Sequence, residues 1–99
     1  MSDEDKLLKA RTDGSRAQTL INDELLQGAF SELKRAYTEK LLATSIDQGP
    51  ARETLYQAHR LVGEVENHLR RILDAGKLAD AELNNLISLQ ERKRGLFGR

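Results

Sequence analysis

The sequence contains no cysteine. That absence excludes a disulfide framework, a thiol nucleophile and every metal site that needs a cysteine ligand. Aromatic residues make up only 4% of the chain, and charged residues make up 32%. Sheets usually need more aromatic and β-branched side chains than this, whereas helical bundles do not. The composition therefore predicts an all-α fold, and 99 residues suffice for one domain.

The chain also has no excess of positive or negative charge, because 16 Lys and Arg residues balance 16 Asp and Glu residues. No field of the whole chain would therefore draw it to nucleic acid or to anionic lipid. No apolar run approaches the length of about 18 residues that a membrane span needs, and no apolar segment of the signal-peptide kind follows the N-terminus. We expect a soluble cytoplasmic protein without a membrane partner.

Charge is nevertheless placed unevenly along the chain. Three carboxylates open it in "SDED", and four cations close it in "RKRGLFGR". Clustered cations can contact phosphates, so this end is a candidate for DNA binding. The alternative is a solvated helix end whose cations complement the helix dipole. The residues concerned are Arg92, Lys93, Arg94 and Arg99.

Hydrophobic periodicity predicts a first long helix over residues 23–44, with Asn22 or Asp23 as its N-cap. Before it, the polar residues 1–14 end in the turn-like "TDGS" and are expected to form a flexible acidic arm, followed by a short helix from Ser15. "SIDQGP" breaks the pattern after the first long helix, and Pro50 suits the first turn of the next one.

The second long helix is expected over residues 50–75. Six apolar residues alternate there at spacings of three and four: Leu55, Ala58, Val62, Val65, Leu69 and Ile72. Gly76 should end this helix as a left-handed C-terminal cap. We expect the two long helices to form an antiparallel hairpin that places Phe30 opposite Val62. A shorter C-terminal helix over 78–94 would complete a single helical domain of residues 15–94, before a frayed basic tail at 95–99.

No arrangement of residues predicts catalysis. His59 and His68 are nine residues apart, so they point to opposite sides of a helix and cannot share a metal ion. Glu64 and His68 could supply two ligands, but such a pair is more often a surface hydrogen bond. Ser31, Ser45 and Ser88 lack a neighbouring base, the carboxylates fall on polar faces, and no glycine-rich phosphate loop occurs. An enzyme with His59 or His68 as its base is the rival that we disfavour; we expect no cofactor.

Gly63 is unexpected in the middle of a helix, because glycine costs about 1 kcal/mol there relative to alanine. It lies beside Tyr56 on the helical wheel, where a second chain could approach closely. The alternative is a tolerated glycine beside a partly exposed tyrosine. Several apolar positions also fall outside the hairpin seam and would need a partner. The predicted oligomer or partner interface comprises Tyr56, Gly63, Leu61, Leu73 and Leu89.

Three segments, "RAQTLINDELLQGAF", "ARETLYQAHRLVGEVENHL" and "AGKLADAEL", resemble a group of short, largely uncharacterised helical proteins of tailed phages and prophages. The resemblance covers residues 11–85. In that group a tryptophan often stands where this chain has Tyr56, and another aromatic residue often lies near Leu41. The group carries no catalytic motif that could be transferred to this chain.

The resemblance implies a phage context, in the host cytoplasm or in the virion. In outline the predicted hairpin is similar to the oligomerisation core of small terminase subunits, which help to initiate DNA packaging. We therefore expect a non-enzymatic, homo-oligomeric assembly protein whose basic end contacts DNA or a larger phage protein. The alternative is a phage inhibitor or regulator that binds a host protein through the helical face of Tyr56 and Gly63.

Overall fold

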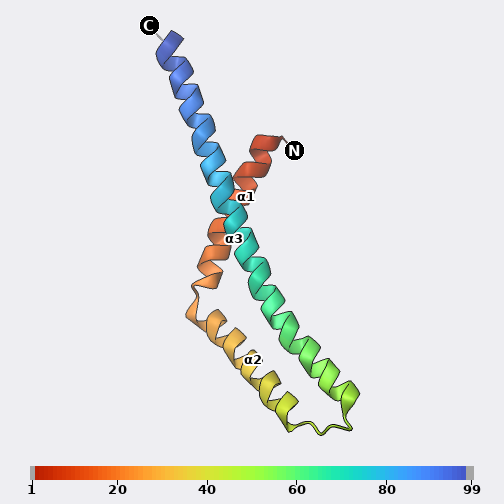
Figure 1. The fold of residues 1–99 in the computed structure, drawn as a ribbon. Helices are drawn as coiled ribbons and strands as arrows, with labels where there is room; N and C mark the ends of the chain where they lie inside the picture. Colours follow the sequence, from red (N-terminus) through yellow and green to blue (C-terminus); the bar gives the residue numbers. More distant parts are fainter. Residues whose placement is uncertain (1, 98–99) are drawn as a thin grey trace. The chain divides into compact units, whose positions relative to one another are not determined.

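The computed structural model describes residues 2–97 of the chain and the side chains of residues 2–95. These residues form three α-helices and no strand, which confirms the all-α prediction: α1 (Asp3–Ile21), α2 (Glu24–Ala43) and α3 (Gly49–Phe97) (Figure 1). No helix within the described range combines the length and the hydropathy that crossing a membrane would demand.

The start of α2 is fixed by Asp23. Its backbone is extended, with φ −71° and ψ 119°, and its carboxylate oxygen accepts a hydrogen bond from the Leu26 N–H at 2.9 Å. This bond satisfies one of the first-turn N–H groups that have no partner inside the helix. The predicted N-cap at Asp23 is therefore confirmed.

A short connection joins α2 to α3. Thr44 leaves the helical conformation, and the Ser45 N–H donates to the Gln48 side-chain oxygen at 3.0 Å. Pro50 then occupies the first turn of α3, as predicted, where its missing N–H would have had no helical partner. The Asp47 carboxylate accepts a hydrogen bond from the Ser45 hydroxyl, which lowers the pKa of that carboxyl group.

The prediction for the N-terminal segment was wrong about its structure. Residues expected to form an irregular acidic arm up to "TDGS" belong to α1, which begins at Asp3. The Ser2 hydroxyl accepts from the Asp5 N–H at 3.1 Å, and the acidic first turn complements the positive end of the helix dipole. Lys9 and Asp13 are four residues apart in the same helix. Their ion pair, with Nζ 2.7 Å from Oδ2, stabilises that helix.

The prediction that Gly76 ends a helix was also wrong. No glycine among the described residues has a positive φ, so the left-handed cap is absent there, and α3 continues to Phe97. The expected third helix over 78–94 is the second half of α3 rather than a separate element. The tail predicted to fray is helical up to Phe97, while Gly98 and Arg99 lie outside the described residues.

The chain divides into two compact units, and the expected domain of residues 15–94 includes parts of both. Unit 1 comprises residues 1–18 and 71–99, and unit 2 comprises residues 19–70. In unit 1, α1 and the later part of α3 bury a small core of Gly14, Ala17, Gly76, Ala79 and Leu83. In unit 2, by contrast, no residue is buried. Every side chain of unit 2 is therefore at least partly open to solvent.

The core of unit 1 rests on contact between two helix backbones. A methyl group added to Gly14 would lie 2.6 Å from the Gly76 Cα, and one added to Gly76 would lie 2.9 Å from the Ala10 carbonyl oxygen. No side chain fits between helices at this separation, so both positions require glycine. Gly14 and Gly76, which the sequence pattern predicted as part of a turn and as a helix cap, therefore lie inside helices and allow those helices to pack closely.

Candidate interaction surfaces

An ion pair joins α2 and α3 in unit 2. The Lys34 ammonium contacts Oε1 of Glu66, an oxygen that is shielded from solvent and accepts no hydrogen bond from another described group. Because a shielded carboxylate oxygen without a partner is costly, the Lys34 ammonium compensates the charge of Glu66 at this point of the contact between α2 and α3. Phe30 lines one pocket together with Glu66 and Leu69, and its predicted pairing with Val62 stays a prediction.

We expect Lys34→Ala to lower the free energy of unfolding by about 1 to 2 kcal/mol, because it leaves Glu66 Oε1 shielded and unpaired. The two side chains are 40% and 26% exposed, so solvent screening reduces the loss below that of a fully buried pair. Urea unfolding monitored by circular dichroism measures this loss of stability.

Arg35→Ala is the matched control for this variant. Arg35 pairs with Glu32 and Glu39 at 2.9 Å each, and its hydrogen bonds to those carboxylates raise the pKa of its guanidinium. All three groups lie on the exposed surface of α2, so the control should change stability little. If both variants lost the same free energy of unfolding, the Lys34–Glu66 pair would be no more important for stability than an exposed pair.

One pocket of about 240 Å³ lies in unit 2, where the end of α1 and the start of α2 meet α3. Its volume is below the range of about 300 to 1,000 Å³ that is usual for small-molecule sites. It therefore offers little support for a substrate or cofactor. The lining residues are Leu20, Ile21, Gln27, Phe30, Ser31, Glu66, Leu69 and Arg70.

The five residues predicted to form one interface are divided between the two units. Tyr56, Leu61 and Gly63 lie in unit 2, whereas Leu73 and Leu89 lie in unit 1. Within unit 2, Leu61 points about 140 to 160° away from Tyr56 and Gly63 around the axis of α3. A single flat partner could therefore contact only one of these two flanks.

The first flank of α3 in unit 2 carries Tyr56 and Gly63. Tyr56 is 55% exposed, and a methyl group added to Gly63 would meet nothing within 4 Å. Nothing inside the chain therefore requires glycine at this position. Its use as a close-contact point for a partner stays a prediction.

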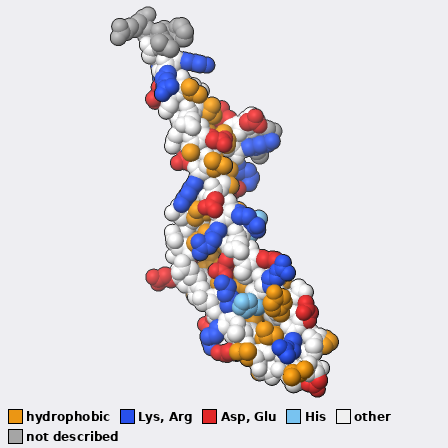
Figure 2. Space-filling model, in the orientation of Figure 1, with side chains coloured by type: hydrophobic (Ala, Val, Ile, Leu, Met, Phe, Trp, Pro, Cys, Tyr) orange, Lys and Arg blue, Asp and Glu red, His pale blue; other side chains and the backbone are white. Residues whose placement is uncertain are grey.

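The opposite flank carries an apolar stripe, the lateral stripe, formed by Ala58, Leu61 and Val65. These residues are spaced by three and four positions, so they lie in one row along the helix. Leu61 is 58% exposed and Val65 is 51% exposed. On the face drawn in Figure 2, hydrophobic side chains reach the surface between charged ones. This spacing matches the rows of side chains along which two helices pack.

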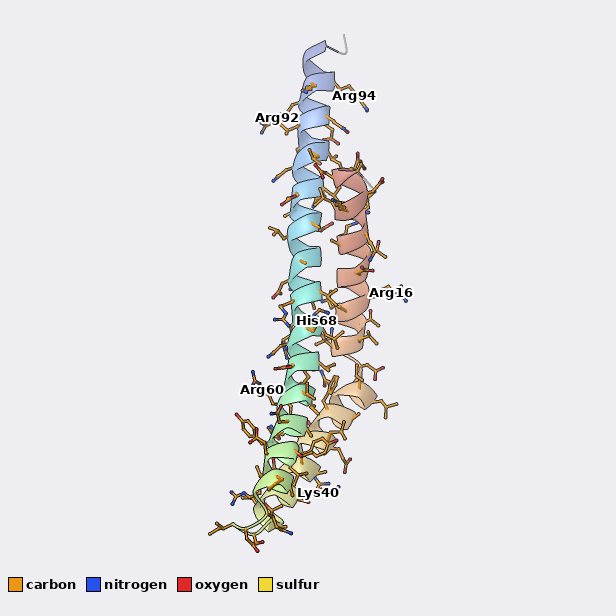
Figure 3. All side chains as sticks on the ribbon, turned by 90° about the vertical axis from the view of Figure 1, so that its right-hand side faces the viewer. Arg16, Lys40, Arg60, His68, Arg92 and Arg94 are labelled. Carbon is orange, nitrogen blue, oxygen red and sulfur yellow. The ribbon has the colours of Figure 1, made fainter. Side chains whose placement is uncertain are left out.

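Three of the four cations predicted to contact DNA are exposed near the end of α3: Arg92, Lys93 and Arg94. Figure 3 shows Arg92 and Arg94 extending to different sides of the helix, so they cannot both face one surface. Arg99, the fourth residue of this prediction, lies outside the described residues. The DNA contact stays a prediction.

The two histidines lie apart from other potential metal ligands among the described residues. His59 is half-buried and His68 is exposed, and no group of three or more His, Asp or Glu residues in the described part of the chain could hold a metal ion. Glu64, the potential second ligand beside His68, pairs with Arg60 at 3.2 Å instead. The surfaces described above are therefore the stronger candidates for function.

Comparison of the chain with protein-family models, with curated proteins and with solved structures gave no match.

Proposed function

We propose that this chain is a non-enzymatic assembly protein that completes its helical core by binding further copies of itself. The observation that carries the proposal is that unit 2 buries none of its residues. Eight large hydrophobic side chains in this unit are exposed: Leu20, Leu25, Leu33, Leu42, Ile46, Tyr56, Leu61 and Val65. Adding helices from other copies is the usual way in which a two-helix pair acquires a buried core.

The lateral stripe is the surface through which the copies would meet. Its residues repeat at the spacing of a coiled-coil seam. When the α3 helices of two copies pack along this stripe, each helix covers Leu61 and Val65 of the other. Burying an aliphatic side chain of this size contributes about 1.5 to 3 kcal/mol. Two such residues from each copy can therefore support a stable contact.

The tailed-phage resemblance supplies a biological setting for this assembly. A ring or bundle of helical subunits would act in virion formation or, like the small terminase subunits, in DNA packaging. Under that proposal the protein works in the cytoplasm of the host cell or within the virion. The exposed cations near the end of α3 would then contact DNA or a larger phage protein.

The dependence of thermal unfolding on chain concentration tests the self-association. When only the folded chain associates, mass action raises the midpoint temperature as the concentration rises. We expect the midpoint, followed by circular dichroism at 222 nm, to rise by several degrees over a hundredfold increase in concentration. A midpoint that does not change would contradict the proposal.

A further inference from the structure

The pocket in unit 2 combines an apolar part with a positive charge. Arg70 lines the pocket, is exposed, and forms no ion pair with another described residue. Glu66 also lines the pocket, but Lys34 compensates its negative charge. The pocket therefore offers an apolar space beside an unpaired cation. Its apolar part consists of Leu20, Ile21, Phe30 and Leu69.

The volume of this pocket suits one side chain of a partner. At about 240 Å³ it exceeds the volume of about 150 Å³ at which an apolar cavity in another protein holds a benzene molecule. An isoleucine side chain has fewer carbon atoms than benzene, so it fits. Small pockets that receive one large apolar side chain are frequent in contacts between proteins.

The connection between α2 and α3 carries groups that complement this pocket. We call its residues 44–48 the tip loop (Figure 1). Ile46 is 91% exposed, the largest fraction for any large hydrophobic side chain in the described part of the chain. The next residue, Asp47, is negatively charged, because the hydrogen bond from the Ser45 hydroxyl lowers the pKa of its carboxyl group. The tip loop thus presents an apolar side chain beside an anion.

Hydrogen bonds within the tip loop hold these two side chains at its surface. The Ser45 N–H donates to Oε1 of Gln48, and the Gln48 N–H donates to the Ser45 carbonyl oxygen, at 3.0 Å each. A loop that is already ordered loses little conformational entropy when it binds. The tip loop is therefore well suited to insert a side chain into a pocket.

The tip loop cannot reach the pocket of its own chain. Phe30 lines the pocket, and the unbroken helix from Phe30 to Ala43 is about 20 Å long. The tip loop begins only after this helix ends. Any tip loop that occupies the pocket must therefore belong to another copy.

From these observations we infer that the tip loop of one copy binds the pocket of a second copy, with Ile46 in the apolar part and Asp47 beside Arg70. The two surfaces are different parts of unit 2, so the contact is head-to-tail. Each copy that binds through its tip loop still offers its own pocket. A contact of this kind continues from copy to copy and forms a ring where the rotation closes, or a filament where it does not.

This contact is small, and an exposed ion pair adds little to it. It would act together with the lateral stripe. Two copies joined at their lateral stripes carry two tip loops and two pockets, which raises the effective concentration of each surface for the next pair. The inference therefore rests on the proposed self-association.

Disulfide trapping tests the inference, because the chain contains no cysteine of its own. One chain carries Ile46→Cys and the other carries Ser31→Cys in the pocket lining, so Asp47 and Arg70 are unchanged. Cysteine is itself a small apolar residue and can still enter the pocket. In an equimolar mixture under mild oxidation, the disulfide between the two chains should form at least about tenfold faster than in a control mixture. Mass spectrometry distinguishes this heterodimer from the two homodimers.

The control mixture contains Thr38→Cys in place of Ser31→Cys. Thr38 is exposed like Ser31 and lies on the same side of α2, about two turns away and outside the pocket lining. Circular dichroism shows whether the variants keep their helices. Equal rates in the two mixtures would overturn the inference. Faster formation of a disulfide between two Ile46→Cys chains would overturn it in favour of a contact between two tip loops.

Charge reversal tests the pairing of Asp47 with Arg70. Adding Arg70→Glu to the Ser31→Cys chain should slow heterodimer formation at least about threefold, because like charges then meet. Adding Asp47→Lys to the Ile46→Cys chain should restore the rate. Arg52→Glu is the matched control, since Arg52 is exposed on the same side of α3 but does not line the pocket. A rate that Arg70→Glu leaves unchanged would overturn this pairing.

Failure of this inference differs from failure of the proposed function. If the unmodified chain forms multimers but the disulfide shows no preference for the pocket, only the tip-loop contact is wrong. If the unmodified chain is monomeric at every concentration, the proposed self-association is wrong as well.

Discussion

Replacing Gly14 by alanine is expected to lower the free energy of unfolding by about 1 to 3 kcal/mol, although alanine is the better helix former. The new methyl group would lie 2.6 Å from the Gly76 Cα and 3.2 Å from the Ile72 carbonyl oxygen. Both neighbours are backbone atoms, which cannot turn aside as a flexible side chain can. The two helices must therefore separate, and that movement opens the core around Ala17 and Leu83.

Gly28→Ala provides the matched control in α2, because a methyl group there would meet nothing within 4 Å. It should raise stability by up to about 1 kcal/mol through helix propensity alone. Urea unfolding gives the free energies of unfolding of the two variants for comparison. Hydrogen exchange of the α1 amides shows whether the loss of stability is located in α1. If the Gly14 variant proved as stable as the Gly28 variant, the backbone contact with Gly76 would not exist in solution.

The double variant Leu61→Glu, Val65→Glu is expected to weaken self-association at least about a hundredfold. Each replacement removes a side chain whose burial contributes about 1.5 to 3 kcal/mol, and 1.4 kcal/mol corresponds to a factor of ten. It also places like charges opposite each other in the contact. The solution mass should therefore fall towards that of a single chain at concentrations where the unmodified protein is a multimer.

Leu42→Glu is the control for this double variant. Leu42 is 80% exposed and lies on the side of α2 that faces away from α3, so the same kind of change there should leave the mass unchanged. Because Leu61 and Val65 are themselves more than half exposed in the single chain, the helix content should be kept. A double variant with the mass of the unmodified protein would exclude the lateral stripe as the contact.

Local chemistry made part of this fold predictable. Asp23 before a periodic apolar segment identified the start of α2, and Pro50 after Gly49 identified the start of α3, because caps and first-turn prolines act within one helical turn. Gly14 and Gly76 were misjudged for the opposite reason. Each looks like a turn or cap in its own segment, and its actual role depends on a helix more than sixty residues away in the sequence.

The candidate surfaces were predictable to a similar extent. The spacing in α3 identified Leu61 as lying outside the main seam, and Tyr56 as the neighbour of Gly63. The pairing of Lys34 with Glu66 could not be predicted, because a wheel shows which residues share a face but not how far one helix is shifted along another.

Sedimentation equilibrium of the unmodified chain, over a range of concentrations, measures the proposed self-association. We expect a mass that rises with concentration to a defined multiple of 11.2 kDa, because unit 2 buries none of its own residues and is proposed to bind other copies. A mass of 11.2 kDa at every concentration would contradict it.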